Sequence, residues 1–310
     1  MFSSIPSLAR ARRKTARRGA VVVALGAAIL GTGTPRGAAA QLVRAAAGPT
    51  AADVTGARDQ FRLDLGGGLV AGANGLFTDG TGARREINWD GVGAGVAAPN
   101  NLPADFFNTL SPRGAVFATP GTGFQVSGAT NDGLAGQPAA ASFGNIDPSY
   151  TTTFLPFSPQ RLFTALGSNI VDVNFFVPGT NTPGLVRGFG SIFSDVDLAN
   201  TTSIAFFGAN GVALGTFFAP NVVGAQSFSF LGVSFSTAIV ARVRITNGNA
   251  ALGAGVTDQN GIPRDLVVMD DFLYGEPTGI SAVPEPATLG LVGLGLLALG
   301  APVMRRRRNG

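Results

Sequence analysis

The chain has 310 residues, of which 13% are charged, and it contains no cysteine and no histidine. These absences exclude disulfides, Ser-His-Asp and Cys-His catalysis, and zinc sites that use histidine. The formal net charge of +4 suggests an anionic partner, but residues 45–282 hold 10 basic and 17 acidic residues, a net charge of −7. The region between the two basic ends is therefore acidic, which argues against nucleic-acid binding.

The first 40 residues predict a secretory signal peptide. Six basic residues between Arg10 and Arg18 precede an apolar run at 20–30, and small residues lead up to Ala40 and Gln41. We expect signal peptidase to cut between Ala40 and Gln41 after the general export machinery has moved the chain. The twin-arginine route is less favoured because no large apolar residue directly follows the Arg pair. An N-terminal membrane anchor is the alternative, but the apolar run is short.

Residues 41–60 are rich in alanine and polar residues and are interpreted as a linker or a frayed terminus. From 61 onward, Gly, Asn, Asp, Pro and Thr separate short apolar runs, and long helical periodicity is absent. This predicts an all-β fold over 61–277, an antiparallel β-sandwich that is jelly-roll-like. Residues 61–150 either add strands and loops to the sandwich or form a small separate domain. The expected strands are 115–117, 123–126, 170–177, 185–194, 203–207, 213–218, 227–235, 239–246 and 266–274.

Three local patterns sharpen this prediction. Asn210-Gly211 between two apolar runs predicts a tight hairpin, because both residues tolerate positive φ. Residues 239–246 alternate between an apolar face and a face that carries Arg242 and Arg244. In 227–235 the apolar phase shifts between Phe230 and Leu231, which suggests a β-bulge.

Two pairs of aspartates are candidate metal ligands. Asp195 and Asp197 are two residues apart and would share a face of a strand, and Asp270 and Asp271 lie within an apolar strand, where a buried carboxylate needs a partner. Ca²⁺ is one candidate partner, since it takes carboxylate oxygens and needs neither His nor Cys. Pairing with Arg242 and Arg244 is a second interpretation, and a solvated or turn-capping role is a third.

Trp89, the single tryptophan, lies in the segment Glu86-Ile-Asn-Trp-Asp90. Trp beside Asn and Asp is a candidate ligand site, a stacking platform for a sugar, and a core anchor is the alternative. Glu86 and Asp90 are the least unsuitable carboxylate pair for a glycosidase, which would need two such groups beside a cleft.

The C-terminal residues combine three signals. Val283-Pro284-Glu285-Pro286 closes a linker at 278–286, because the prolines hold this segment extended. Residues 287–304 carry no charge and are long enough, about 27 Å as a helix, for a transmembrane helix. The basic tail, 305–310, begins with the stop-transfer residues Arg305, Arg306, Arg307 and Arg308, which would stay in the cytoplasm.

Motif, span and arginines in this order resemble the PEP-CTERM sorting signal of Gram-negative bacteria. The resemblance implies export, transient insertion as a single-pass membrane protein, and processing by an exosortase that leaves the protein at the cell surface or outside the cell. We therefore expect a non-catalytic surface or extracellular-matrix protein, with polysaccharide and Ca²⁺ as candidate ligands. A secreted polysaccharide-degrading enzyme and a permanently anchored surface protein are the alternatives.

Overall fold

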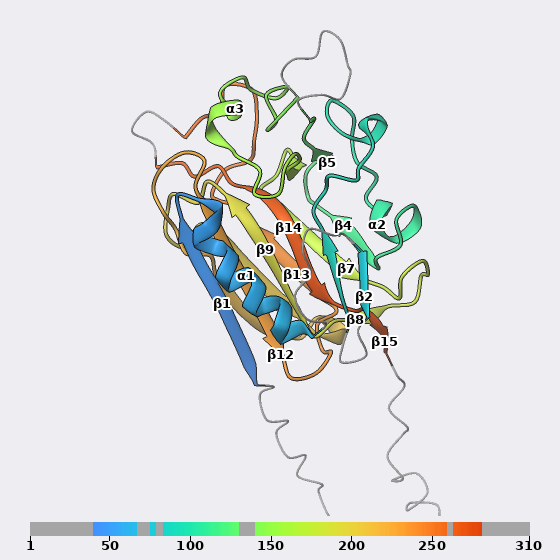
Figure 1. Cartoon of the computed structure of the whole chain (residues 1–310). Helices are drawn as coiled ribbons and strands as arrows, with labels where there is room; N and C mark the ends of the chain where they lie inside the picture. Colours follow the sequence, from blue (N-terminus) through green and yellow to red (C-terminus); the bar gives the residue numbers. More distant parts are fainter. Residues whose placement is uncertain (1–39, 67–74, 79–82, 130–139, 259–262, 281–310) are drawn as a thin grey trace, which may run out of the picture. The chain divides into compact units, whose positions relative to one another are not determined.

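The computed structural model describes residues 40–66, 75–78, 83–129, 140–258 and 263–280 (Figure 1). The described part is mostly β, with antiparallel strand pairs and few helices, as the sequence predicts. The elements are β1 (Gln41–Gly48), α1 (Ala51–Leu65), β2 (Gly75–Thr78), β3 (Ala83–Ile87), α2 (Phe106–Thr109), β4 (Ala115–Ala118), β5 (Gly123–Val126), α3 (Tyr150–Thr153), β6 (Phe163–Leu166), β7 (Ile170–Phe175), β8 (Gly184–Leu185), β9 (Gly188–Ser194), β10 (Ser203–Phe207), β11 (Ala213–Phe218), β12 (Phe228–Phe235), β13 (Arg242–Thr246), β14 (Val268–Gly275) and β15 (Thr278–Gly279), with short 3₁₀ turns at Ala94–Val96 and Ala209–Gly211.

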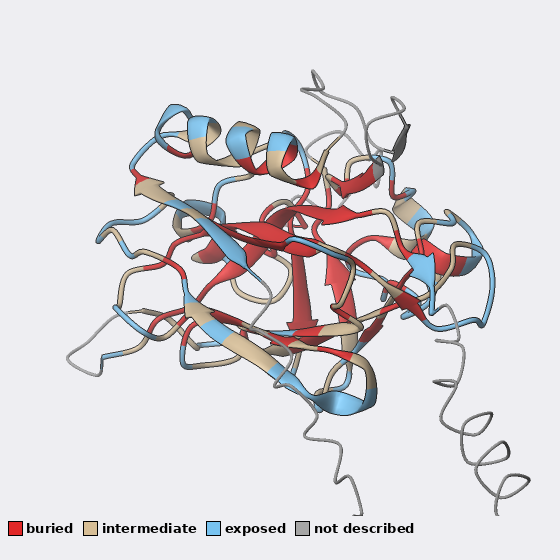
Figure 2. Ribbon diagram, turned by 90° about the horizontal axis from the view of Figure 1, so that it is seen from below, coloured by how far each residue is buried: buried red, intermediate tan, exposed pale blue. Residues whose placement is uncertain are grey.

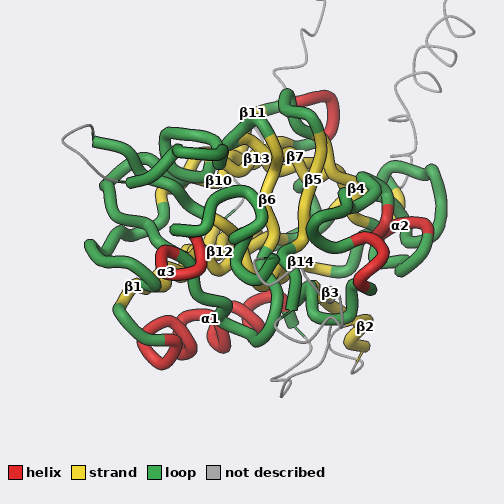
Figure 3. The backbone as a smooth tube through the Cα atoms, turned by 90° about the horizontal axis from the view of Figure 1, so that it is seen from above, coloured by secondary structure: helices red, strands yellow, loops and turns green. Residues whose placement is uncertain are grey.

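Two antiparallel sheets form two layers (Figure 3). The larger sheet has the order β1-β12-β9-β14-β3-β2, with β6 pairing to β14 and β5 to β6. The smaller sheet has the order β11-β10-β13-β7-β4, and β8 pairs with β15 in a short third ladder. This arrangement agrees with a sandwich, whereas the jelly-roll-like topology stays a prediction.

The main core lies between these layers, where the strands of both sheets are buried (Figure 2). Phe193 of β9 and Phe272 of β14 belong to the same cluster as Val173 of β7 and Ile245 of β13. Along β13 the buried Val243 and Ile245 alternate with arginines, so the predicted two-faced pattern is confirmed.

Helix α1 covers the opposite face of the larger sheet and lies against β1 and β12 (Figure 1). It begins with a capping box, because the Asp53 carboxylate accepts the Thr50 backbone N–H at 2.9 Å. Phe61 packs with Phe230 of β12 at 5.7 Å between ring centroids. Residues 41–60, expected to be a linker, are therefore β1 and most of α1. That interpretation was wrong because tertiary packing decides the structure of this segment: β1 pairs with β12, and α1 packs on the larger sheet.

All nine expected strands are present, with shifted ends in several cases. The bulge expected between Phe230 and Leu231 is not there, because β12 pairs with β1 and with β9 without a shift in register. The apolar phase shifts for another reason: Phe228 and Phe230 face α1, whereas Leu231 and Val233 face the main core. The Asn210-Gly211 turn joins β10 to β11 with positive φ at both residues, as predicted.

The described body is one compact unit, and the described parts of residues 61–150 contribute β2, β3 and β5 to the larger sheet and β4 to the smaller sheet. Its two ends lie at the same end of the larger sheet (Figure 1). Ala40 accepts a hydrogen bond from the Ser236 N–H at 3.1 Å, and Thr278 pairs with Leu185. Among the described residues, no helix has the length and apolar character to cross a membrane. The predicted signal peptide and the predicted span at 287–304 lie outside these residues.

Candidate functional site

Asp270 and Asp271 form a β-bulge in β14. β14 pairs Met269 with Phe193 and Phe272 with Ser191, so Asp270 and Asp271 together lie opposite a single residue of β9. Both aspartates are buried, and the register shift brings both carboxylates to the Ser158 hydroxyl, which lies 3.1 Å from Asp270 and 2.9 Å from Asp271.

These carboxylates anchor the loop that contains Ser158. Asp270 Oδ2 also accepts the backbone N–H groups of Phe157 at 2.6 Å and Ser158 at 3.2 Å. Burial and the neighbouring charge of Asp271 raise the pKa of Asp270 well above its usual value, and burial raises the pKa of Asp271 to about 6. The pair therefore shares protons and loop hydrogen bonds, which is a structural role.

Asp195 and Asp197 belong to a different cluster from Asp270 and Asp271. Asp195 follows β9 in a left-handed conformation, with φ of 71°, and is 2% exposed. Its Oδ1 atom has no hydrogen-bond partner among the described residues. Burial, followed by the negative charges of Asp197 and Asp258, raises the pKa of Asp195 to about 9.

The neighbours of Asp195 are held by the loops around it. Asp197 accepts the Gly224 N–H at 2.8 Å, and Asp258 accepts the Leu266 N–H at 2.8 Å. Asp265 accepts the Asp197 N–H at 2.9 Å and a short hydrogen bond from Thr201. Burial raises the pKa of Asp258 to about 6 and also raises the pKa of Asp265. Each of these shifts favours the protonated form of a carboxyl group in the cluster.

The four predicted calcium ligands do not form one site, because Asp195 and Asp197 lie in one cluster and Asp270 and Asp271 in another. Within the described residues, no three acidic side chains are placed so that they could hold a metal ion. Pairing of these aspartates with Arg242 and Arg244 was also wrong. Both arginines bind Asp172, which lies opposite Arg244 on β7, at 2.6–2.9 Å.

Trp89 is a core anchor. It has no exposed surface, and its ring stacks on Phe163 with 4.1 Å between centroids and 6° between planes. Its indole N–H donates to the Asp270 carbonyl at 2.9 Å, which satisfies the one polar group of the side chain. The interpretation of Trp89 as an exposed platform for a sugar was wrong, since a sugar needs an open ring face.

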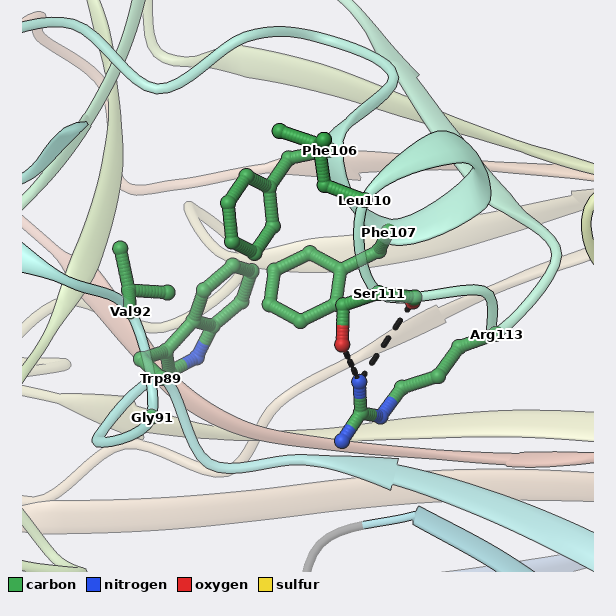
Figure 4. A pocket seen from close by; sticks show the side chains of 8 residues that line it. All are labelled: Trp89, Gly91, Val92, Phe106, Phe107, Leu110, Ser111 and Arg113. Atoms are coloured by element: carbon green, nitrogen blue, oxygen red, sulfur yellow. Dashed lines mark hydrogen bonds between the residues drawn. The ribbon is translucent and has the colours of Figure 1, made fainter.

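A cavity of about 240 Å³ nevertheless lies beside Trp89 (Figure 4). Its walls include Phe106, Phe107, Leu110, Ser111 and Arg113, which come from α2 and the loop after it. Leu110 is 70% exposed, whereas Phe107 is buried against Trp89 with the ring centroids 5.5 Å apart. The cavity therefore combines an open apolar wall with a cationic group next to the single tryptophan.

Glu86 and Asp90 do not form a free carboxylate pair. Glu86 is 4% exposed, and its oxygens accept hydrogen bonds from Arg62 at 2.6 and 2.9 Å and from Arg84 at 2.7 Å. Asp90 accepts backbone N–H groups of Gln160 and Arg161. Both carboxylates are thus used to hold the structure together.

The tail at the C-terminus has a counterpart among known families. A comparison with protein families matches residues 282–308 to the PEP-CTERM protein-sorting motif. The chain carries a PEP-CTERM sorting motif. This match confirms the resemblance drawn from the sequence. Proteins with this motif are exported, pass through the membrane during sorting and are processed by exosortase. The motif residues Val283, Pro284, Glu285 and Pro286 and the arginines 305–308 lie within the match but outside the described residues.

Searches of curated proteins and of solved structures found no match. The sequence does not mark Arg113 as a candidate, because no motif identifies an arginine that has no carboxylate partner among the described residues. The capping pattern Thr50-x-x-Asp53, together with Val54, Phe61 and Leu65 on one helical face, could have revealed α1.

Proposed function

We propose that the chain is a non-catalytic protein of the cell surface or extracellular matrix, whose β-sandwich body is delivered by its PEP-CTERM tail. The observation that carries this proposal is the match at residues 282–308 to the sorting motif. The motif accounts for export and processing, and the properties of the body supply the argument against catalysis.

The body supports a non-catalytic role through its carboxylates. A glycosidase needs two carboxyl groups roughly 5–10 Å apart beside a cleft. Glu86, a candidate for such a role, is buried between two arginines, and Asp270 and Asp271 are engaged by a loop. The proposal therefore takes these carboxylates as structural, and a polysaccharide is the candidate ligand of the body.

The ends of the body support delivery by membrane-bound segments. The two ends of the body lie at one end of the larger sheet (Figure 1), and only seven residues, 280–286, separate Gly279 from Ala287, where the predicted span begins. The eight Cα–Cα steps from Gly279 to Ala287 reach at most about 29 Å when the chain is extended. A body held this way stays close to the membrane surface until the tail is cut.

The proposal is tested by the intact mass of the exported protein in cells with and without exosortase. We expect an N-terminus at Gln41 and loss of the residues that follow the Pro-Glu-Pro motif only when exosortase is present. Glu285→Ala is expected to leave the tail uncut, whereas the control Ser281→Ala, just outside the matched residues, is processed normally. Full-length tail on mature surface protein in exosortase-containing cells would instead favour a permanent anchor.

A further inference from the structure

Among the described residues, no carboxylate pairs with Arg113, although the body of the protein is acidic. Only its Nη1 atom has hydrogen-bond partners within the described part of the chain, the hydroxyl and the carbonyl of Ser111. The Nε atom is buried and makes no hydrogen bond. Burial, together with repulsion from Arg85, lowers the pKa of Arg113. An incoming anion would therefore offset an existing energetic cost.

The nearest cation does not compete for such an anion. Arg85 is bound through Nε and Nη2 to both carboxylate oxygens of Glu276, at 2.5 and 2.8 Å. Its Nη1 atom donates to the Pro112 carbonyl at 3.1 Å. Arg85 is thus neutralised by Glu276, and Arg113 keeps an uncompensated charge at the cavity.

The backbone of Arg113 is fixed before any ligand arrives. Its N–H donates to the Phe107 carbonyl at 2.8 Å, and its carbonyl accepts the Tyr274 hydroxyl at 3.1 Å. The guanidinium carbon lies 5.4 Å from the centroid of the Phe107 ring (Figure 4). Because these contacts already order the backbone of Arg113, binding a ligand costs less conformational entropy.

The cavity also selects the kind of anion. At about 240 Å³ it is smaller than the roughly 300–1,000 Å³ of drug-sized sites, so it suits one ring and not a long oligomer. Phe106 and Leu110 offer apolar surface in the same cavity as Arg113, and Phe107 and Ser111 lie between them and the guanidinium in Figure 4. A guanidinium binds a carboxylate through parallel hydrogen bonds, and apolar walls accept the C–H face of a sugar ring.

We propose that this cavity binds a uronic acid residue, with its carboxylate on Arg113 and its ring against Phe106 and Leu110. The net charge of −7 on the body does not prevent this, because charges beyond about 8 Å are screened at physiological salt. The inference rests on the proposed function only in taking the ligand from outside the cell. Binding is measured on purified exported protein, so a failure of tail processing would leave the result unchanged.

The test compares methyl β-D-glucuronide with methyl β-D-glucoside, which differ at the carboxylate. Trp89 is the single tryptophan and contacts Phe107, so its fluorescence reports on this cavity, and calorimetry provides an independent readout. We expect the glucuronide to bind at least tenfold more tightly than the glucoside, and its affinity to fall as NaCl is added. Equal binding of the two sugars, or no binding of either by calorimetry, would overturn the proposal.

Arg113→Gln is expected to reduce glucuronide affinity at least tenfold. The matched control is Arg264→Gln, because Arg264 is also half-buried and, within the described part of the chain, donates only to the Thr257 carbonyl, at 2.8 Å. Unchanged glucuronide binding by folded Arg113→Gln would contradict the assignment, as would tighter binding of N-acetylglutamate, which would indicate a peptide carboxylate. If Arg113→Gln fails to fold, the comparison of the two sugars on the unaltered protein still decides the question.

Discussion

Gly190 and Gly232 lie directly opposite each other on β9 and β12, and the ring of Phe61 packs over both. A Cβ atom added at Gly190 would lie 2.8 Å from this ring, and one added at Gly232 would lie 2.7 Å from it. The two glycines thus create the space in which α1 approaches the sheet.

Replacing Gly232 by alanine should therefore destabilise the protein by about 1–3 kcal/mol, the usual cost of overpacking. The matched control is Gly56→Ala within α1, where an added Cβ meets nothing within 4 Å. This substitution should stabilise the protein by up to about 1 kcal/mol through helix propensity. Denaturant unfolding measures both values, and a Gly232→Ala protein as stable as the unaltered one would show that α1 is not packed as described.

The free energy of unfolding should fall as the pH rises, because the buried Asp195 carboxyl then favours losing its proton. Its folded pKa of about 9 lies far above the value of about 4 in an unfolded chain, so the folded state binds more protons between these two values. The stabilisation is complete below pH 4 and is lost towards pH 9. We expect Asp195→Asn, which tolerates positive φ, to be more stable than the unaltered protein at pH 8 by about 1–3 kcal/mol.

The check is thermal melting from pH 5 to pH 9, with the exposed Asp105→Asn as control. The difference between Asp195→Asn and the unaltered protein should grow with pH, and a constant difference would argue against a protonated Asp195. Melting with Ca²⁺ and with EDTA belongs to the same experiment. A rise in melting temperature with Ca²⁺ that disappears in Asp195→Asn would show that a cation, and not a proton, neutralises this cluster.

Trp89→Phe should destabilise the protein by about 1–3 kcal/mol. The change leaves a void against Phe163 and removes the donor that satisfies the Asp270 carbonyl. Leu110→Ala at the cavity wall is the control, and its effect should be below about 0.5 kcal/mol because Leu110 is 70% exposed. Equal effects in chemical denaturation would contradict the central position of Trp89.

Asp172→Asn should weaken the smaller sheet, because it removes a charge bound by Arg242 and Arg244. We expect a loss of about 1 kcal/mol, since Arg244 is nearly half exposed and the solvent screens the pair. Burial disfavours ionised Asp172, but the hydrogen bonds of the two arginines outweigh burial and lower its pKa. This stabilisation is present above about pH 4 and is lost as the pH falls further. The difference between variant and unaltered protein should thus shrink in acid, and a difference that persists at pH 2 would have another cause.

The sequence predicted the strands well because their apolar runs and turn residues are local signals. Asn210-Gly211 needs only its own backbone preferences to form a turn, and Val243 and Ile245 alternate with polar neighbours. It did not predict that β12 is covered on both faces. Phe230 faces a helix whose Phe61 lies 169 positions earlier in the chain, and the pattern of β12 alone cannot distinguish this from a bulge.

The candidate sites were predicted less well, because their chemistry depends on which side chains meet. The buried aspartates were recognised, but the partner of Asp270 and Asp271 is a serine in a loop, and the partner of Arg244 is Asp172. Each of these contacts joins residues more than 70 positions apart. The predicted ligand residue, Trp89, is closed to solvent, but a cavity lies directly beside it.

The pairing of β1 with β12 has a consequence for the order of events during export. Gln41 pairs with Phe235, so the first strand has no partner until most of the body has crossed the membrane. Until then the sheet does not hold Ala40 through its hydrogen bond with Ser236. If signal peptidase cuts at the predicted site between Ala40 and Gln41, late pairing of the first strand would leave time for cleavage before the sheet holds this site in place.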